Sequence, residues 1–435
     1  MNKTVKGLFD FIEKSPSQFH AIENQRQAFL TAGFEELQES KQWEILPGKS
    51  YFVTRNGSSI IAFRMPTNDY TSFMIMASHS DSPTFRIKEM PEMKEGHYVK
   101  LNTEKYGGML MAPWFDRPLS IAGRAIVKNG DSKLKVCLVD LDRDLCMLPS
   151  LAIHMNREAN DGYKYNAQKD MLPLISMDEK FNLKELVAKS LLVKAEDIVG
   201  SDLFLYNREP GKVWGADEEF ISCRRLDDLQ CSYSSMVGLL AAKNSKTAIQ
   251  VHATFDNEEV GSGTKQGADS TFLFDVLTRI NEAVGGNNSR LLAAIANSFM
   301  VSADNAHALH PNYSEKSDPT NKVYMNEGIV IKFNANQKYM TDGLAFGIFS
   351  EICKKAKVPY QTFVNRSDVA GGSTLGNISN AHVSINGVDI GLAQLAMHSP
   401  YETAGAKDTD YLVKLAKIFY ETIIENTASL DYTLK

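Results

Sequence analysis

Apolar and polar positions form two kinds of pattern in the first ninety residues of this chain. In the first thirty residues, apolar side chains recur every three or four positions, which predicts two helices separated by a Ser-Pro-Ser break at 15–17. Alternating positions at 51–64 predict two strands around an Asn-Gly turn, and the compact apolar run at 73–77 has the length of a buried strand. The chain therefore begins as a mixture of helices and strands.

The pattern changes near residue 90. Short strand-like pieces with Gly-Gly, Asn-Gly and Asp-Arg punctuation continue to about residue 150, and residues 122–127 and 134–139 predict a hairpin. A charged helical pattern at 178–194 and a strand pattern at 202–206 complete this part. We interpret residues 90–222 as a β-rich insertion.

Helices and strands alternate again after residue 222, which favours a largely parallel sheet with helices on both faces. We therefore predict a mixed α/β fold. Its mainly parallel sheet, flanked by helices, is formed by one domain that is split into residues 1–89 and 223–435 around the β-rich insertion. The predicted elements are helices at about 228–243, 270–283, 289–297, 341–355 and 407–427, and strands at 249–255, 299–302, 329–333, 360–364 and 382–385.

Composition narrows the class of protein. The 435 residues carry a net charge of −6, which argues against binding to nucleic acid, because that needs a basic surface. No stretch approaches the about 20 apolar residues of a membrane span, and the first ten residues lack the apolar core of a signal peptide. The five cysteines are widely spaced without a Cys-x-x-Cys pair. We therefore expect reduced thiols in a cytoplasmic protein with no nucleic-acid or membrane partner.

Two adjacent glutamates, Glu258 and Glu259, follow the predicted strand at 249–255 and precede Gly261. Successive side chains on an extended backbone point to different sides, so two neighbouring carboxylates at a strand end can do different work. One can bind a metal ion while the other carries a proton to or from a substrate. The alternative is a pair of solvated glutamates on a loop.

Histidine and aspartate residues stand at two further element ends. His79 and Asp81 follow the apolar run at 73–77, and a metal-binding histidine usually donates its second ring N–H to a carboxylate such as Asp81. A surface histidine with a surface aspartate is the alternative. Asp227 stands at the start of a predicted helix, where capping is the alternative to metal binding.

Asp304 and His398 occupy comparable positions later in the chain. Asp304 follows the apolar run at 299–302, beyond the carboxyl end of a predicted strand, which is where open α/β sheets bind their ligands. A helix cap is the alternative for this aspartate. His398 precedes Ser-Pro, so it does not lie in the middle of a helix, and a buried hydrogen-bonded histidine is its alternative.

Together these residues offer two histidines and three carboxylates as metal ligands, with one carboxylate left as a base. Imidazole and carboxylate suit zinc, and cobalt or manganese also fits. Two metal ions about 3.5–4 Å apart and bridged by one carboxylate can activate water for attack on a peptide bond. A free glutamate can take the proton of that water and pass it to the leaving amine. Spacing alone does not show that the five segments converge.

The motifs and their order resemble the aspartyl aminopeptidase family of dinuclear zinc metallopeptidases, which is metallopeptidase family eighteen. The resemblance covers essentially the whole chain, and so many motifs in one order are highly specific. It implies a peptide hydrolase with two Zn²⁺ ions per subunit. The motifs lie at 15–21, 78–83, 151–154, 225–227, 256–262, 302–304, 310–313 and 397–399.

The resemblance also implies a role for each site residue. Glu258 would be the general base, and Asp81 would be the partner that holds His79. The implied ligands are His79 and Asp304 for one zinc ion, Glu259 and His398 for the other, and Asp227 as the bridge.

Substrate binding and assembly are implied in the same way. His154, in the inserted domain, would reach the active site of a neighbouring subunit and contact the substrate, although a histidine in an apolar run is by itself a core residue. Lys332 occupies the position of a family lysine that would pair with an N-terminal Asp or Glu of the peptide; an ordinary lysine at a strand edge is the alternative. Family members assemble from dimers into tetrahedral dodecamers, so the insertion would be the dimerisation domain.

Two other functions stay open at this point. A related dinuclear enzyme could remove the acyl group from N-acyl amino acids, and a non-catalytic scaffold could keep the same fold. The scaffold is disfavoured because all ligand positions and the base are chemically intact. The glycine-rich run at 370–376 lacks the Lys-Ser/Thr ending of a phosphate loop, and we expect a tight turn beside the active site.

Overall fold

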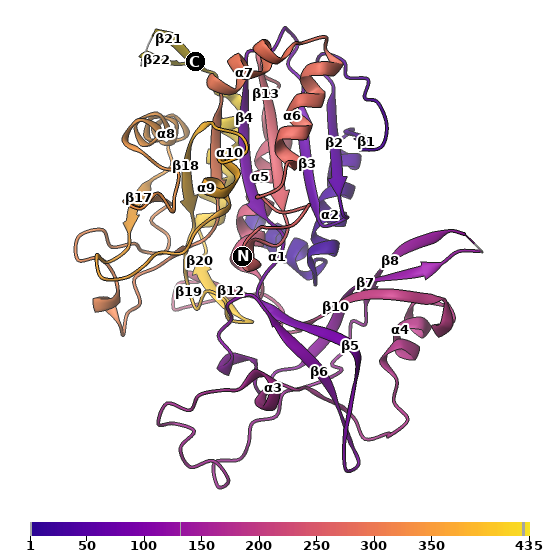
Figure 1. Ribbon diagram of the computed structural model, residues 1–435. Helices are drawn as coiled ribbons and strands as arrows, with labels where there is room; N and C mark the ends of the chain where they lie inside the picture. Colours follow the sequence, from indigo (N-terminus) through magenta and orange to yellow (C-terminus); the bar gives the residue numbers. More distant parts are fainter. Residues whose placement is uncertain (1, 131, 429–430) are drawn as a thin grey trace.

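A nine-stranded mixed sheet forms the centre of the larger lobe of the computed structural model, which describes residues 2–130, 132–428 and 431–435 (Figure 1). Its strands lie side by side in the order β1 (Glu35–Leu37), β2 (Ser50–Arg55), β3 (Ser59–Arg64), β13 (Ala248–Phe255), β4 (Ser72–His79), β14 (Phe299–Ala303), β18 (Asn386–Gly391), β16 (Ile329–Phe333) and β17 (Tyr360–Val364). The four central strands β13, β4, β14 and β18 pair in parallel. Antiparallel partners, β3 and β16, lie on either side of them. The predicted mainly parallel sheet is confirmed.

Helices cover both faces of this sheet (Figure 1). The side chains of β4 alternate between two cores, with Met74 and Met76 on one face and Phe73 and Ile75 on the other. Each such side chain stabilises the fold by about 1.5–3 kcal/mol when it is fully buried, so the central strands are firmly held. The first core contains α1 (Lys3–Glu13), α2 (Gln18–Thr31), α5 (Leu226–Ala241), α8 (Gly343–Ala356) and α10 (Asp408–Glu421), and the second contains α6 (Phe272–Ala283), α7 (Asn288–Ala296) and α9 (Leu375–Ser379).

The smaller lobe is a six-stranded antiparallel sheet with its own core (Figure 1). Helices α3 (Ala167–Asp170) and α4 (Leu183–Leu191) belong to the same lobe. Its strands lie in the order β8 (Leu134–Asp140), β7 (Leu119–Lys128), β10 (Ile198–Asn207), β5 (Thr84–Glu95), β6 (Tyr98–Tyr106) and β9 (Leu174–Ser176).

The smaller sheet thus extends from Thr84 to Asn207, whereas the change of pattern in the sequence suggested 90 and 222 as the limits of the insertion. The difference arises because residues 212–223 pair with the larger lobe. They form β11 and β12 of a five-stranded sheet, whose order is β11 (Lys212–Trp214), β12 (Phe220–Cys223), β20 (Glu402–Gly405), β19 (Ala393–Leu395) and β15 (Ala306–His307). The division of the chain into domains stays a prediction.

Two expected elements are wrong. Residues 382–385 are not a strand, because the backbone N–H groups of His382 and Val383 both donate to the Ser379 carbonyl oxygen at the end of α9. Val383 is nevertheless buried, because its side chain packs into the second core of the larger lobe. The last helix ends at Glu421 rather than 427, since the β-branched run that follows enters the hairpin of β21 (Ile424–Ala428) and β22 (Asp431–Leu434).

No helix in the described part of the chain is both long and apolar enough to cross a membrane.

A buried hydrogen-bond network joins α2 to β13 and α5. Nε2 of His252 donates to Oε1 of Gln25 (2.8 Å), and Nε2 of Gln25 in turn donates to Oγ of Ser232 (2.8 Å). The Ser235 hydroxyl lies 2.8 Å from Nδ1 of His252 and supplies its proton. All four side chains are buried, and burial lowers the pKa of His252 to about 3. The fold therefore keeps this imidazole neutral.

We predict that His252 makes the fold acid-sensitive. The unfolded chain binds a proton at His252 below pH 6.5, while the folded chain resists it down to about pH 3, so stability falls as the pH falls through this window. Between pH 6.5 and 5 the loss is about 2 kcal/mol in the free energy of unfolding. Urea unfolding of metal-free protein at both pH values measures it. His252→Gln should remove this part of the slope, and an equal slope in the variant would contradict the assignment.

Candidate metal centre

The carboxyl ends of three adjacent parallel strands meet at one edge of the larger sheet. β4 ends at His79, and β14 ends one residue before Asp304. The turn after β13 carries Glu258 and Glu259 in a short 3₁₀ helix. Because the strands are neighbours, motifs far apart in the sequence lie together at the edge where open α/β sheets bind ligands.

Two further residues reach the same place from irregular backbone. Asp227 lies in the first turn of α5, where Asp227 and Asp228 have non-helical dihedral angles and a cis peptide bond between them. His398 lies in the turn between β19 and β20 and has a φ of 67°. The alternative that Asp227 caps the helix is wrong, because its carboxylate faces His79 and His398.

The Asp227 carboxylate lies between the two histidines. Its Oδ1 is 3.3 Å from Nε2 of His79, and its Oδ2 is 3.5 Å from Nε2 of His398. Nε2 of His79 is also 3.9 Å from Oδ1 of Asp304, and Nε2 of His398 is 3.4 Å from Oε2 of Glu259. Two ligands bound tetrahedrally to one zinc ion at about 2.0–2.1 Å lie about 3.3 Å apart. The observed spacings are close to this value.

Several carboxylate oxygens in this cluster lack hydrogen-bond donors. Among the described residues, no hydrogen bond reaches Oδ1 of Asp227, Oδ1 of Asp228 or Oε1 of Glu259, although all three atoms are buried. Buried anionic oxygens without partners are costly, and a metal cation satisfies them. The residues fit a metal ion for this reason. Ligand atoms lie within 4.8 Å of one another in three overlapping groups: His79, Asp227, Asp228 and Asp304; His79, Glu258 and Glu259; and Asp227, Glu259 and His398.

The surplus of acidic groups controls the protonation of the site. Burial favours the neutral imidazole, but the hydrogen bond and charge of Asp227 raise the pKa of His398 to about 9. The pKa of His79 is raised well above its ordinary value against the effect of burial, chiefly by Asp227. Burial raises the pKa of Glu258 to about 8, near the range that suits a general base.

Both histidines present the same ring nitrogen to the cluster. Nδ1 of His79 donates to the carbonyl oxygen of Asp81 (3.2 Å) and lies 3.4 Å from Oδ1 of the same residue. Nδ1 of His398 donates to the carbonyl oxygen of Gly108 (2.6 Å). A carbonyl oxygen only accepts, so Nδ1 carries the proton in each neutral ring and Nε2 offers its lone pair. Asp81 therefore lies next to His79, on the side away from the other ligands.

A cavity of about 200 Å³ opens beside the cluster, and Glu258 and Glu259 form part of its wall. The alternative of two solvated glutamates is wrong, because the Glu259 side chain is only 4% exposed and Glu258 is half-buried at the wall of the cavity. Residues 372–374 also line the cavity, as expected for the glycine-rich turn. Lys332 of β16 is a buried residue of an interior strand, so the alternative of a strand-edge lysine is wrong.

His154 is the one predicted site residue that the single chain does not bring to the cluster. It lies in a turn of the smaller lobe, is exposed to solvent, and is not part of the cavity wall. The alternative that His154 is a core residue is therefore wrong.

Two buried acids beside the ligands were missed by sequence reasoning. Oδ2 of Asp228 accepts a hydrogen bond from the backbone N–H of His79 (3.1 Å). Glu402 accepts hydrogen bonds from the backbone N–H groups of Asp227 (3.0 Å) and His398 (2.7 Å). An aspartate at a helix start is expected to cap it. The position of Glu402 four residues after His398 is the one signal that pointed to it.

The parallel sheet and the histidine–carboxylate cluster at its carboxyl edge define a metalloenzyme of the α/β class. A family profile described as aminopeptidase I zinc metalloprotease (M18) matches residues 11–420. The chain belongs to this family and is a zinc metallo-aminopeptidase.

Individual relatives match over nearly the whole chain. The probable M18 family aminopeptidase 2 of Clostridium acetobutylicum is 47% identical over 425 residues, which are 95% of this chain and 98% of the relative. Among solved structures, a chain of the Ape4 and Nbr1 complex gives a TM-score of 0.92 at 37% identity, over 96% of this chain and 85% of that chain. The mApe1 dodecamer of S. cerevisiae gives 0.85 at 26% identity, over 96% of both chains. These matches favour an aminopeptidase over a deacylase or a scaffold.

We predict that Asp227→Asn weakens metal binding more than a change of any other single residue of the cluster. The amide keeps one acceptor oxygen and loses the charge, so neither histidine retains its shared anionic partner. Zinc affinity is expected to fall by more than about 100-fold. About 100-fold is the upper range for loss of a residue that only hydrogen-bonds to a metal ligand. Metal analysis after dialysis against graded chelator measures it, with the exposed-pair variant Asp275→Asn as control. Zinc content equal to the wild type would contradict this prediction.

Proposed function

We propose that the chain removes N-terminal residues from peptides at a site that holds two zinc ions per subunit. The position of the Asp227 carboxylate, with one oxygen toward each histidine, carries this proposal. Cobalt or manganese also suits these ligands. The proposed ligands are His79 and Asp304 for one ion, Glu259 and His398 for the other, and Asp227 as the bridge.

Bound zinc ions lower the pKa of a water molecule and polarise the scissile carbonyl group. Glu258, at the wall of the cavity beside the proposed ligands, would accept a proton from this water and donate it to the leaving amine. Asp81 holds Nδ1 of His79 on one side. The two oxygens of Asp81 also accept the backbone N–H groups of Glu258 (3.1 Å) and Glu259 (3.2 Å). Asp81 therefore positions both a ligand and the base.

Glu258→Gln tests the role of the base. The variant should bind as much zinc as the wild type, because Glu258 is not a proposed ligand, and kcat should fall by about 10²–10⁴-fold. Rates with dipeptide substrates, together with metal analysis, separate the two effects, and Glu282→Gln on the exposed side of α6 is the control. Turnover close to the wild-type rate would exclude Glu258 as the base. Cleavage of N-acetyl amino acids but not of peptides would contradict the proposed reaction.

Lys332 supports a preference for peptides that begin with Asp or Glu. Its Nζ donates to the Asn305 carbonyl oxygen (2.9 Å) and lies 3.8 Å from Oδ2 of Asp304, at the wall of the cavity. Burial favours the neutral amine, but Asp304 and Tyr339 raise the pKa of Lys332, so it stays charged. A buried cation beside the metal cluster is suited to bind the carboxylate of an acidic N-terminal residue.

Lys332→Met tests this preference. The ratio of kcat/KM for aspartyl over leucyl substrates should fall by about 10- to 100-fold, the worth of one charge-assisted hydrogen bond. Zinc content must be compared as well, since Lys332 also contacts Asp304. Lys246→Met, at an exposed position before β13, should keep the wild-type ratio. A wild-type enzyme that prefers leucyl substrates would contradict the role of Lys332.

The same proposal includes assembly through the smaller lobe. Leu134 and Val136 of the edge strand β8 are 67% and 58% exposed, and an exposed apolar edge strand favours association. In dimers and a tetrahedral dodecamer, the exposed His154 would contact the substrate in a neighbouring active site. The dodecamer described for the S. cerevisiae relative supports this.

Free and mostly buried cysteines support a cytoplasmic location.

A further inference from the structure

Buried carboxylates bind several backbone N–H groups of the cluster, in addition to the strands that position it. Asp228 accepts the N–H of His79, and Asp81 accepts those of Glu258 and Glu259. Glu402 binds backbone amides from two separate segments of the chain: its Oε2 accepts the N–H of Asp227 (3.0 Å), and its Oε1 accepts that of His398 (2.7 Å).

Both residues held by Glu402 lie where regular structure does not fix the backbone. Asp227 has non-helical dihedral angles at the start of α5, and His398 has a positive φ, which is unfavourable for a residue with a side chain. Glu402 itself is 1% exposed and lies on β20, between β12 and β19. The Glu402 side chain, on a strand paired on both sides, therefore holds Asp227 and His398, which do not belong to a strand themselves.

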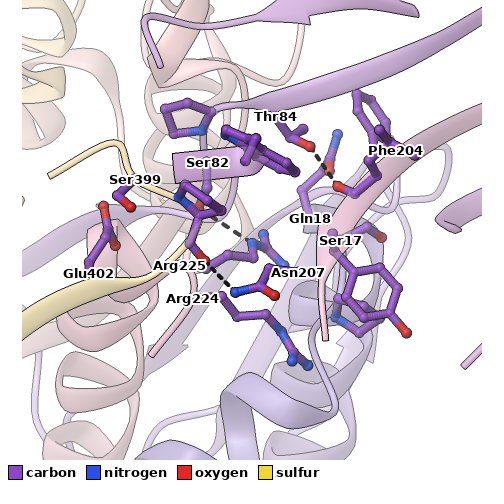
Figure 2. Close-up of a pocket in the computed structure, with 16 residues that line it drawn as sticks. Ser17, Gln18, Ser82, Thr84, Phe204, Asn207, Arg224, Arg225, Ser399 and Glu402 are labelled. Carbon is purple, nitrogen blue, oxygen red and sulfur yellow. Dashed lines mark hydrogen bonds between the residues drawn. The ribbon is translucent and has the colours of Figure 1, made fainter. Parts of the chain in front are cut away.

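The backbone carbonyl group of Asp227 is held as well as its N–H group. The Ser82 hydroxyl donates to the Asp227 carbonyl oxygen (2.7 Å), and Nε of Arg225 donates to the Ser82 hydroxyl (3.3 Å). Ser82, Arg225, Ser399 and Glu402 line a small cavity of about 30 Å³ (Figure 2). None of these four residues lines the larger cavity beside the cluster, so Glu402 contacts the site through Asp227 and His398 and not through that cavity.

We propose that Glu402 is a positioning residue of the metal centre, which sets the distance between the bridging aspartate and the second histidine by binding both backbone amides. This inference rests on the proposed two-zinc site and adds a residue to it. Glu402 touches neither metal nor substrate. It acts through Asp227 and His398, so its first effect is on metal affinity and its effect on turnover follows from that.

Glu402→Gln is the test, because glutamine has the same shape but offers one acceptor oxygen and one N–H₂ donor. The donor must face a backbone N–H, so one of the two hydrogen bonds is lost and two donors oppose each other. Zinc affinity, measured by competition with a chelator on the purified full chain, should fall by about 10- to 100-fold. The melting temperature of the metal-free protein is measured in parallel.

Asp408→Asn is a matched control. Asp408 is a fully buried carboxylate that also accepts two backbone N–H groups, those of Asn326 (2.7 Å) and Gly328 (3.2 Å), away from the cluster. The control should lower the melting temperature of the metal-free protein and leave zinc affinity unchanged. If both variants lose zinc affinity in proportion to their loss of melting temperature, Glu402 has only a general structural role and the proposal is overturned.

The remaining outcomes separate this inference from the proposed function. Wild-type zinc affinity in Glu402→Gln overturns the role of Glu402 and leaves the two-zinc site intact. Failure of the wild type to bind two zinc ions overturns both. If Glu402→Gln does not fold, Glu402→Asp carries the same expectation, because its shorter carboxylate keeps the charge but cannot reach both amides.

Discussion

The concentration of buried negative charge at one edge of the larger sheet is the constraint on which the site depends. Two like unit charges 4 Å apart repel each other by about 4 kcal/mol at an effective dielectric constant of about 20. Burial and neighbouring carboxylates accordingly raise the pKa of Glu259 and of Asp228 well above their ordinary values. Among the described residues, acids outnumber basic side chains here. The acids are Asp81, Asp227, Asp228, Asp304, Glu258, Glu259 and Glu402, and the basic side chains near them are His79, His307, His398, Arg225 and Lys332. Such a cluster persists only if protons or metal cations balance its charge, and the unpaired oxygens of Asp227 and Glu259 point to metal cations.

The fold supplies what such a cluster needs. Parallel strands with a core on each face fix His79 and the residues after β13 and β14 to within the spacing of metal ligands. Asp227 and His398, which complete the cluster, stand on irregular backbone. At these two residues, the buried carboxylate of Glu402 holds the backbone by accepting its N–H groups. The same N–H groups give the carboxylate the hydrogen bonds that a buried charge requires.

Much of this could be predicted from the sequence, because the strongest signals were local. An apolar run followed by a histidine or carboxylate marks a strand end, which is why His79, Asp304 and the glutamate pair were found. Asp228 and Glu402 were missed because their partners are backbone amides of residues that only the folded chain brings close. The strand expected at 382–385 failed for a related reason, since apolar side chains such as Val383 fill the core from a turn as well as from a strand. The range of the smaller sheet also depends on pairing that composition does not reveal, namely that of β12 with β20.

The two lobes meet at His398, which links the smaller lobe to the histidine–carboxylate cluster of the larger one. The Gly108 carbonyl oxygen accepts a hydrogen bond from Nδ1–H of His398, and the N–H of Leu110 donates to the carbonyl oxygen of the same histidine (3.1 Å). Both contacts come from the segment after β6, the strand that carries the chain through the smaller sheet. Because the first contact keeps the proton on Nδ1, it leaves Nε2 turned toward Asp227 and Glu259. The smaller lobe therefore helps to determine which nitrogen of His398 faces the cluster.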